Sequence, residues 1–334
     1  MEFPAILPTQ AGEIVYLPKE PSLPRLALRH LAPTDNTPRQ TGGIVLYIHG
    51  ATFPSGLAVG YRFDGWSWMD DLAAARCDVW ALDFPGYGES ERYAAMDTGE
   101  ANAAPLCRTP EASEHIARAV AFIRARCGDA RVSLIAHSWG TLAAGHFAAA
   151  HPQSVDRLAL FAPIIRRDSV LPGGVAPAFR DIPLAAQWAR FVEDVPAHEP
   201  PVLLQRHFDK WGADYLATDP TSGRRMPPSV RTPGGPMADI AAAWGGKVPY
   251  DPAQIVAPTL IVRGAWDSLC TDADSHWLFD ALRSAPRKQD VKLSRATHLM
   301  HLEEGRFALY RVVQSFLEGG DTPMTGNPHT NTRR

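Results

Sequence analysis

The sequence lacks three features that would mark a specialised class of protein. Its four cysteines (Cys77, Cys107, Cys127 and Cys270) show no CxxC spacing, which disfavours a zinc site and predicts reduced thiols in a cytoplasmic protein. No stretch reaches the roughly 18 consecutive apolar residues of a membrane-spanning helix. The N-terminal segment also lacks the charged start and long apolar run of a secretory signal.

Charge of one sign is not concentrated anywhere. The formal net charge is −3, and the lysines and arginines are scattered, so neither a nucleic acid nor a membrane surface is expected as a partner. Apolar residues make up 45% and charged residues 21%, as is usual for globular proteins. With 334 residues, the chain can form one large domain with an insertion, or two domains. The sequence does not determine an oligomeric state.

Short apolar runs alternate with helical patterns along most of the chain. The runs are rich in Val, Ile and Leu and predict buried strands at 43–50, 78–86, 131–138, 156–163, 258–264 and 290–298. Helices are predicted at 66–77, 111–127, 138–151, 274–284 and 303–317. Two more strands, at 13–17 and 26–31, would form an antiparallel edge. This order predicts an α/β fold with a mostly parallel sheet of about eight strands, flanked by helices on both faces.

The alternation stops at about residue 166 and resumes at about 253. The segment between is rich in proline and contains helix-like pieces at 184–194 and 201–215, with no predicted strand. We therefore expect a core of residues 1–165 and 253–318, and a helical cap of residues 166–252 above the carboxyl ends of the strands. The polar residues 319–334 are expected to form a disordered tail.

Ser138 stands where one predicted strand stops and the next helix begins. The segment Ala136-His137-Ser138-Trp139-Gly140 is close to the Gly-x-Ser-x-Gly turn that presents a serine nucleophile. Small residues are needed on either side because the strand and helix backbones pass close together, and the sharp turn forces the serine into strained backbone angles. A serine that only caps a buried helix is the alternative.

Two later residues supply the base and the acid that a serine nucleophile needs, in the chain order Ser, Asp, His. Asp267, in "RGAWDSLC", and His298, in "RATHLMHLEEG", each follow a predicted strand at its carboxyl end. Asp272 and Asp274 are expected instead to cap the next helix. His301 is expected to pack or to form hydrogen bonds at the start of the last helix.

The remaining candidates would stabilise an oxyanion or contact the substrate. Acyl transfer needs N–H donors for a tetrahedral oxyanion, and these are assigned to the backbone of Trp139 and Ala51, with Thr52 as the second choice for the latter. Substrate contacts are assigned to Thr52, Phe53, Trp188 and Phe191. The cap aromatics Trp188, Phe191, Phe208, Trp211 and Tyr215 recur at helical spacing, which packing also explains. No metal or cofactor is expected.

Four separated segments, "HGATFPSG", "DFPGYGES", "AHSWGT" and the pair "WD" and "TH", together resemble the α/β-hydrolase superfamily across residues 12–317. The resemblance implies a member with a serine nucleophile and a cap. It argues against haloalkane dehalogenases and epoxide hydrolases, which use aspartate at this position. The glycines of "DFPGYGES" are expected to be structural, allowing a tight loop beside the serine.

The segment from "SWGT" to "HFAAAHPQSVDRLALFAP" is similar to proline iminopeptidases, but "HGATFPSG" departs from their usual His-Gly-Gly-Pro loop. In those peptidases, cap carboxylates hold the substrate amine. Glu193, Asp194 and Glu199 could do so here, or they could belong to a solvated helix end.

The sequence therefore predicts a serine hydrolase with a small acyl substrate: an ester, lactone, thioester or small amide, with an ester favoured. An aminopeptidase and an acyltransferase or cyclase that uses the same three residues are the alternatives. A non-catalytic ligand receptor is a further alternative, which the complete Ser–Asp–His set disfavours.

Overall fold

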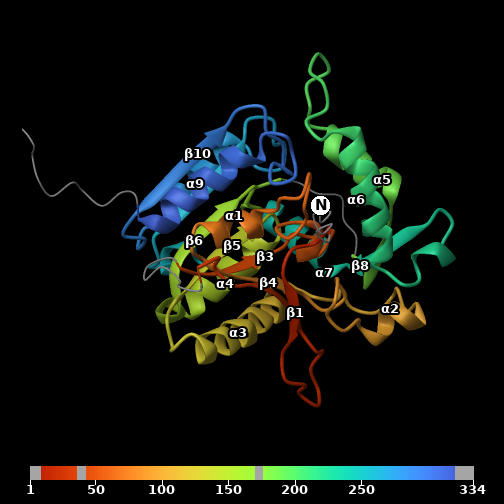
Figure 1. Ribbon diagram of the computed structural model, residues 1–334, viewed down its shortest axis with the longest axis horizontal. Helices are drawn as coiled ribbons and strands as arrows, with labels where there is room; N and C mark the ends of the chain where they lie inside the picture. The colour runs from red at the N-terminus through yellow and green to blue at the C-terminus, as the bar shows by residue number, and fades with distance from the viewer. Residues whose placement is uncertain (1–8, 36–42, 170–175, 320–334) are drawn as a thin grey trace, which may run out of the picture.

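The computed structural model describes residues 9–35, 43–169 and 176–319. An eight-stranded sheet runs through its centre in the order β1-β2-β4-β3-β5-β6-β9-β10 (Figure 1). Its strands are β1 (Glu13–Tyr16), β2 (Ala27–Leu31), β3 (Ile44–Ile48), β4 (Asp78–Asp83), β5 (Val132–His137), β6 (Val155–Phe161), β9 (Thr259–Gly264) and β10 (Lys288–Leu293). All neighbours from β4 to β10 are parallel, and β1 and β2 form the antiparallel edge. The predicted fold class and edge are confirmed.

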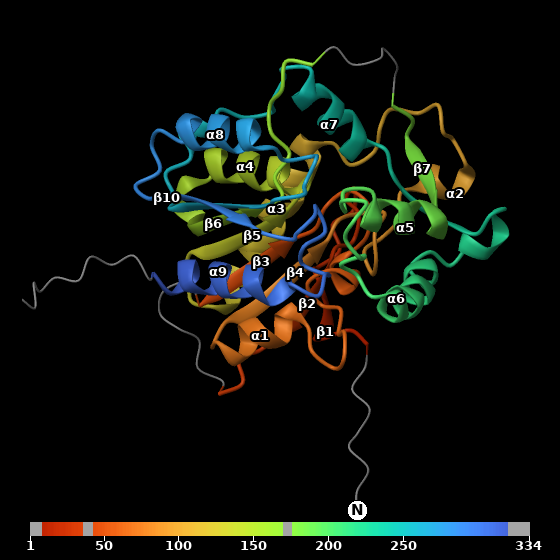
Figure 2. The same cartoon turned by 90° about the horizontal axis from the view of Figure 1, so that it is seen from above.

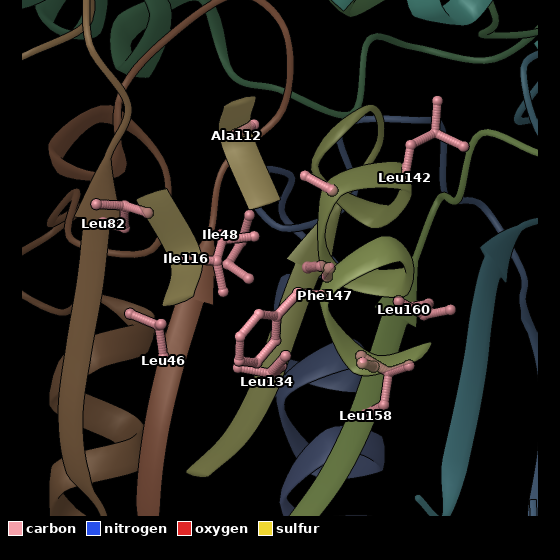
Figure 3. Close-up of a cluster of buried hydrophobic side chains, with 14 of the residues drawn as sticks. Leu46, Ile48, Leu82, Ala112, Ile116, Leu134, Leu142, Phe147, Leu158 and Leu160 are labelled. Atoms are coloured by element: carbon pink, nitrogen blue, oxygen red, sulfur yellow. The ribbon is translucent and has the colours of Figure 1, made fainter. Parts of the chain in front are cut away.

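Helices cover both faces of this sheet (Figure 2). One face carries α3 (Thr109–Arg126), α4 (Gly140–Ala150) and α8 (Asp272–Ala281), and the other carries α1 (Trp68–Ala74) and α9 (Arg306–Glu318). Because side chains alternate along a strand, the continuous apolar run of β3 feeds both cores. Leu46 and Ile48 pack with Leu134 and Phe147 on the α3–α4 side (Figure 3), and Val45 and Tyr47 pack on the other.

The residues 166–252 form what we call the cap segment. It holds β7 (Phe179–Pro183), α5 (Leu184–Val192), α6 (Gln205–Ala217), β8 (Ser229–Pro233) and α7 (Gly235–Trp244). The expectation of an insertion without strands is wrong, because β7 and β8 pair as an antiparallel two-stranded sheet. Their short, proline-containing sequences carry no clear alternation, and the pairing joins segments about 50 residues apart in the chain. The short helix α2 (Ala94–Thr98) lies beside this sheet, where Met96 packs on Phe179.

Two elements near the C-terminus have boundaries that differ from the prediction. β10 begins at 288 and ends at 293 rather than spanning 290–298. It is a half-exposed edge strand, and its first residues are polar, so they lack the apolar pattern that predicts a strand. A turn at Arg295, with a φ of +52°, follows its end. The last helix begins at Arg306 rather than 303. Apart from Gly319, the expected tail lies outside the described residues.

None of the helices in the described ranges is long and apolar enough to cross a membrane.

Candidate active site

Ser138 occupies a sharp turn between β5 and α4. Its φ is +53°, a left-handed conformation that costs energy for any residue with a side chain. The turn is held by hydrogen bonds from the Thr141 amide and hydroxyl to the Ser138 carbonyl, at 2.9 and 2.6 Å. Close packing explains the small residue at 140, since a Cβ on Gly140 would lie 2.3 Å from the His49 carbonyl oxygen. The backbone therefore holds this serine in a strained position at the edge of the sheet.

Ser138, His298 and Asp267 form a continuous hydrogen-bonded chain. The Oγ of Ser138 lies 2.7 Å from Nε2 of His298, and Nδ1 of His298 lies 3.0 Å from Oδ2 of Asp267. Asp267 also accepts the backbone N–H groups of Leu269 and Cys270, at 2.9 and 3.1 Å, which fix the carboxylate. Since a carboxylate only accepts hydrogen bonds, Nδ1 of His298 carries the proton and Nε2 is free to accept from the serine. All three side chains are buried.

The other aspartates and the other histidine considered beside Asp267 and His298 make different contacts. Asp274 caps α8 together with Thr271, as expected, and also pairs with Arg167. Asp272, expected to cap as well, is the first residue of α8 and pairs instead with Arg263 and Lys292. His301 lies outside α9. Its ring packs against the rings of Phe53, His137 and Phe161, and burial lowers its pKa to about 3. His301 is therefore an uncharged ring that packs among aromatic side chains next to the hydrogen-bonded chain.

Two residues that the sequence analysis did not assign support the loop that carries His298. Nε2 of His137 lies 3.0 Å from the carbonyl oxygen of His298, and burial holds the pKa of His137 well below its usual range, so the neutral ring donates this bond. The buried carboxyl of Glu303 accepts the Thr297 amide at 3.2 Å and also the Thr297 hydroxyl. Burial, reinforced by the nearby Asp267, raises the pKa of Glu303 to about 7. In sequence, Glu303 looked like a residue at the start of a helix.

The loop after β3 lies directly against the serine. A Cβ on Gly50 would lie 3.1 Å from the Ser138 Cβ, which places Ala51 beside Ser138. This loop is held from β4: the Phe84 amide donates to Nε2 of His49, whose Nδ1–H then donates to the Gly50 carbonyl at 2.7 Å. The Ala51 carbonyl accepts the Tyr87 hydroxyl at 2.8 Å.

Trp139 is tied to the cap segment. Its indole N–H donates to Oδ2 of Asp239 on α7 at 3.0 Å, and the Thr109 amide donates to the same oxygen at 2.7 Å. Trp139 immediately precedes α4, so its backbone N–H lies at the positive end of a helix. The side chain itself is fully buried, so any contact from this residue to a substrate would come from its backbone.

A cavity of about 240 Å³ opens at Ser138 and His298. Its walls combine the core and the cap segment: Gly50, Ala51, Thr52, Phe53, His137, Arg180, Arg190, Glu193, Met237, Ile240, Trp244, Leu269 and Leu299. Thr52 and Phe53 thus line the cavity that opens at Ser138. The α7 side chains at 237, 240 and 244 were missed, although their spacing of three and four marks one helical face. A larger, open hollow of about 710 Å³ lies between α8, β10 and α9 and contains none of the three residues of the hydrogen-bonded chain.

Trp188 and Phe191 are not among the cavity-lining residues, contrary to their assignment as substrate contacts. The Trp188 ring packs on Phe208 with centroids 4.9 Å apart, and Phe191 packs edge-on to Trp211 at 5.3 Å. These contacts hold α5 against α6, so packing between cap helices accounts for the helical spacing of these aromatics.

The three cap carboxylates are already paired. Glu193 and Asp194 both bind Nη1 of Arg190, and Glu199 lies 2.6 Å from Nη1 of Arg295. A free carboxylate for a substrate amine is therefore not provided by these residues. In the described part of the chain, no cluster of three or more metal-binding side chains could hold a metal ion, and the four cysteines form no disulfides.

The chain belongs to the α/β hydrolase fold family, whose sequence model matches residues 43–305. No curated protein sequence matches it significantly. Among solved structures, a thioesterase domain from the curacin biosynthetic pathway has a TM-score of 0.60 at 16% identity, over 92% of this chain and 99% of that one.

A Paleococcus ferrophilus monoacylglycerol lipase has a TM-score of 0.55 at 19% identity, over 88% and 98% of the two chains. An epoxide hydrolase from Vigna radiata has a TM-score of 0.58 at 13% identity, over 92% and 99%. The three proteins are named for different reactions. At such low sequence identities, the likeness extends to the fold alone.

Proposed function

We propose that the protein is a serine hydrolase that cleaves a small ester through an acyl-enzyme on Ser138, with lactones, thioesters and small amides as chemically related substrates. The observation that carries this proposal is the hydrogen-bonded chain from Ser138 Oγ through both ring nitrogens of His298 to Asp267. The arrangement supplies a nucleophile, a base and a group that orients the base.

In the proposed reaction, Ser138 Oγ attacks the carbonyl carbon while Nε2 of His298 takes the serine proton. Asp267 stabilises the resulting imidazolium, and the backbone N–H groups of Ala51 and Trp139 bind the oxyanion. The imidazolium then donates its proton to the leaving alcohol. Water, activated by the same histidine, releases the acid and restores the serine.

The size and lining of the cavity support a short acyl group. Its volume of about 240 Å³ lies below the roughly 300–1,000 Å³ of pockets that hold drug-sized ligands. Met237, Ile240 and Trp244 provide an apolar wall. The pairing of the cap carboxylates favours this proposal over an aminopeptidase, which would need one of them for the substrate amine.

Labelling with a fluorophosphonate probe and hydrolysis of short-chain p-nitrophenyl esters test the proposal. We expect wild type to be labelled, and Ser138→Ala to lose labelling and at least about 10⁴-fold in kcat. Ser284→Ala, which removes an exposed serine after α8, is the matched control and should behave like wild type. Labelling that persists in Ser138→Ala, or folded wild type that neither reacts nor turns over esters, would contradict the proposal.

A further inference from the structure

Arg180 places a guanidinium in the wall of the Ser138 cavity. It lies on β7, where successive side chains point to opposite faces. Its neighbours Phe179 and Asp181 both contact Arg231, one through its ring face at 4.0 Å and the other through an ion pair at 2.7 Å. Arg180 therefore points to the other face, away from the carboxylate next to it in sequence.

The guanidinium of Arg180 has no hydrogen-bond acceptor and no ion-pair partner within residues 9–35, 43–169 and 176–319, and its Nε is buried. The titratable groups that act on it most are the phenols of Tyr87 and Tyr215, whose hydroxyls donate to the carbonyls of Ala51 and Ile182. Burial lowers the pKa of Arg180. A half-buried charge without a partner is costly, so a ligand that supplies one would be stabilised.

The other charges of the cavity do not offset this one. Arg190 also lines it, but Nη1 of Arg190 is bound by both Glu193 and Asp194. Glu193 is thereby engaged. The α7 part of the wall is apolar, and beside Ser138 and His298 the wall is apolar except for Thr52 and the neutral ring of His137. Among the described residues, Arg180 is thus the charged group of the cavity wall that has no direct partner, and it lies beside an apolar surface and Ser138.

We propose that Arg180 binds a carboxylate group of the substrate, so that the preferred substrate is a short ester carrying a second, ionised carboxyl group. A guanidinium matches a carboxylate with two parallel N–H···O bonds, which gives orientation as well as affinity. This inference rests on the proposed esterase function and names its substrate class.

The test compares kcat/KM for mono-4-nitrophenyl glutarate, which carries a carboxylate, and for 4-nitrophenyl pentanoate, which has a similar length and no charge. Wild type should prefer the charged ester. Arg180→Gln should lower kcat/KM for the charged ester by about 10- to 100-fold and leave the neutral ester within about threefold. Arg180→Lys should keep part of the preference, because it keeps the charge. Arg283→Gln removes an exposed arginine two residues beyond the end of α8 and should change neither value.

Equal kcat/KM for the two esters in wild type, or an equal loss for both in Arg180→Gln, would overturn the inference. Calorimetric binding of the charged ester to Ser138→Ala, with and without Arg180→Gln, separates it from the proposed function. Binding that depends on Arg180, without turnover by wild type, would leave the carboxylate site standing and refute the esterase. Turnover by wild type, with substrate binding that does not depend on Arg180, would support the esterase and refute the carboxylate site. The absence of both binding and turnover would refute both proposals.

Discussion

Glu303 is a buried carboxylic acid beneath the loop that carries His298, and replacing it with glutamine should make the protein more resistant to unfolding at alkaline pH. The carboxyl accepts the amide and the hydroxyl of Thr297, two bonds that a glutamine carbonyl can also accept. The substitution therefore keeps both contacts to one oxygen and replaces the ionisable hydroxyl with an amide NH2 group that does not titrate.

The magnitude follows from the pKa of Glu303, which burial raises from 4.5 to about 7 in the folded protein. Below pH 4.5, Glu303 is protonated in both the folded and the unfolded state and makes no difference. Between pH 4.5 and 7 the unfolded chain releases this proton and the folded protein keeps it, so the free energy of unfolding falls as pH rises. The difference between the two pKa values lowers the free energy of unfolding by roughly 3 kcal/mol, and this loss is complete above pH 7.

Urea denaturation of wild type and Glu303→Gln at pH 4.5 and pH 8 measures this effect. The advantage of the variant should grow by roughly 3 kcal/mol between the two pH values. Glu304→Gln, an exposed neighbour, is the matched control and should follow wild type at both. If Glu303→Gln and wild type show the same pH dependence, the carboxyl is not protonated in the folded protein and the argument fails.

Two further substitutions test the site. Asp267→Asn should lower kcat for ester hydrolysis by roughly 10⁴-fold without unfolding the protein, because an amide no longer stabilises the imidazolium or holds the correct tautomer of His298. Asp272→Asn is the control and should stay near wild type. A loss of less than tenfold in Asp267→Asn would reject the proposed role of Asp267. Gly140→Ala should lower the free energy of unfolding by about 1–3 kcal/mol or more, because the new Cβ would lie 2.3 Å from the His49 carbonyl. Gly305→Ala, where no atom lies within 4 Å of the new Cβ, is the control in urea denaturation, and equal midpoints would refute the steric argument.

Much of the core was predictable because its signals are local. Buried parallel strands such as β5 are continuous apolar runs, and their carboxyl ends lie at one edge of the sheet. Residues that follow such strands, like Ser138 and Asp267, therefore meet there without any knowledge of the intervening loops. The edge strand β10 was less well predicted, since its half-exposed sequence is polar.

Both predicted helices of the cap segment are present, as α5 and α6, but its two strands were not predicted, for the opposite reason. The strands β7 and β8 gain their stability from pairing across about 50 residues of chain, and neither sequence shows that partner. The aromatics Trp188 and Phe191 show the limit of periodicity: it marks a buried face but does not distinguish a packed helix contact from a wall of the cavity.

The sequence by itself determined the fold class, the sharp turn at Ser138 and the chain order of Ser138, Asp267 and His298, because each depends on short stretches of residues. The tertiary structure alone decided which charges are paired. Arg190 meets two carboxylates whereas Arg180 meets none among the residues that the structure describes, and Glu303 is buried under a loop that it supports. The energy of a charge depends on burial and on neighbours brought together from distant parts of the chain, and neither can be obtained from the order of residues.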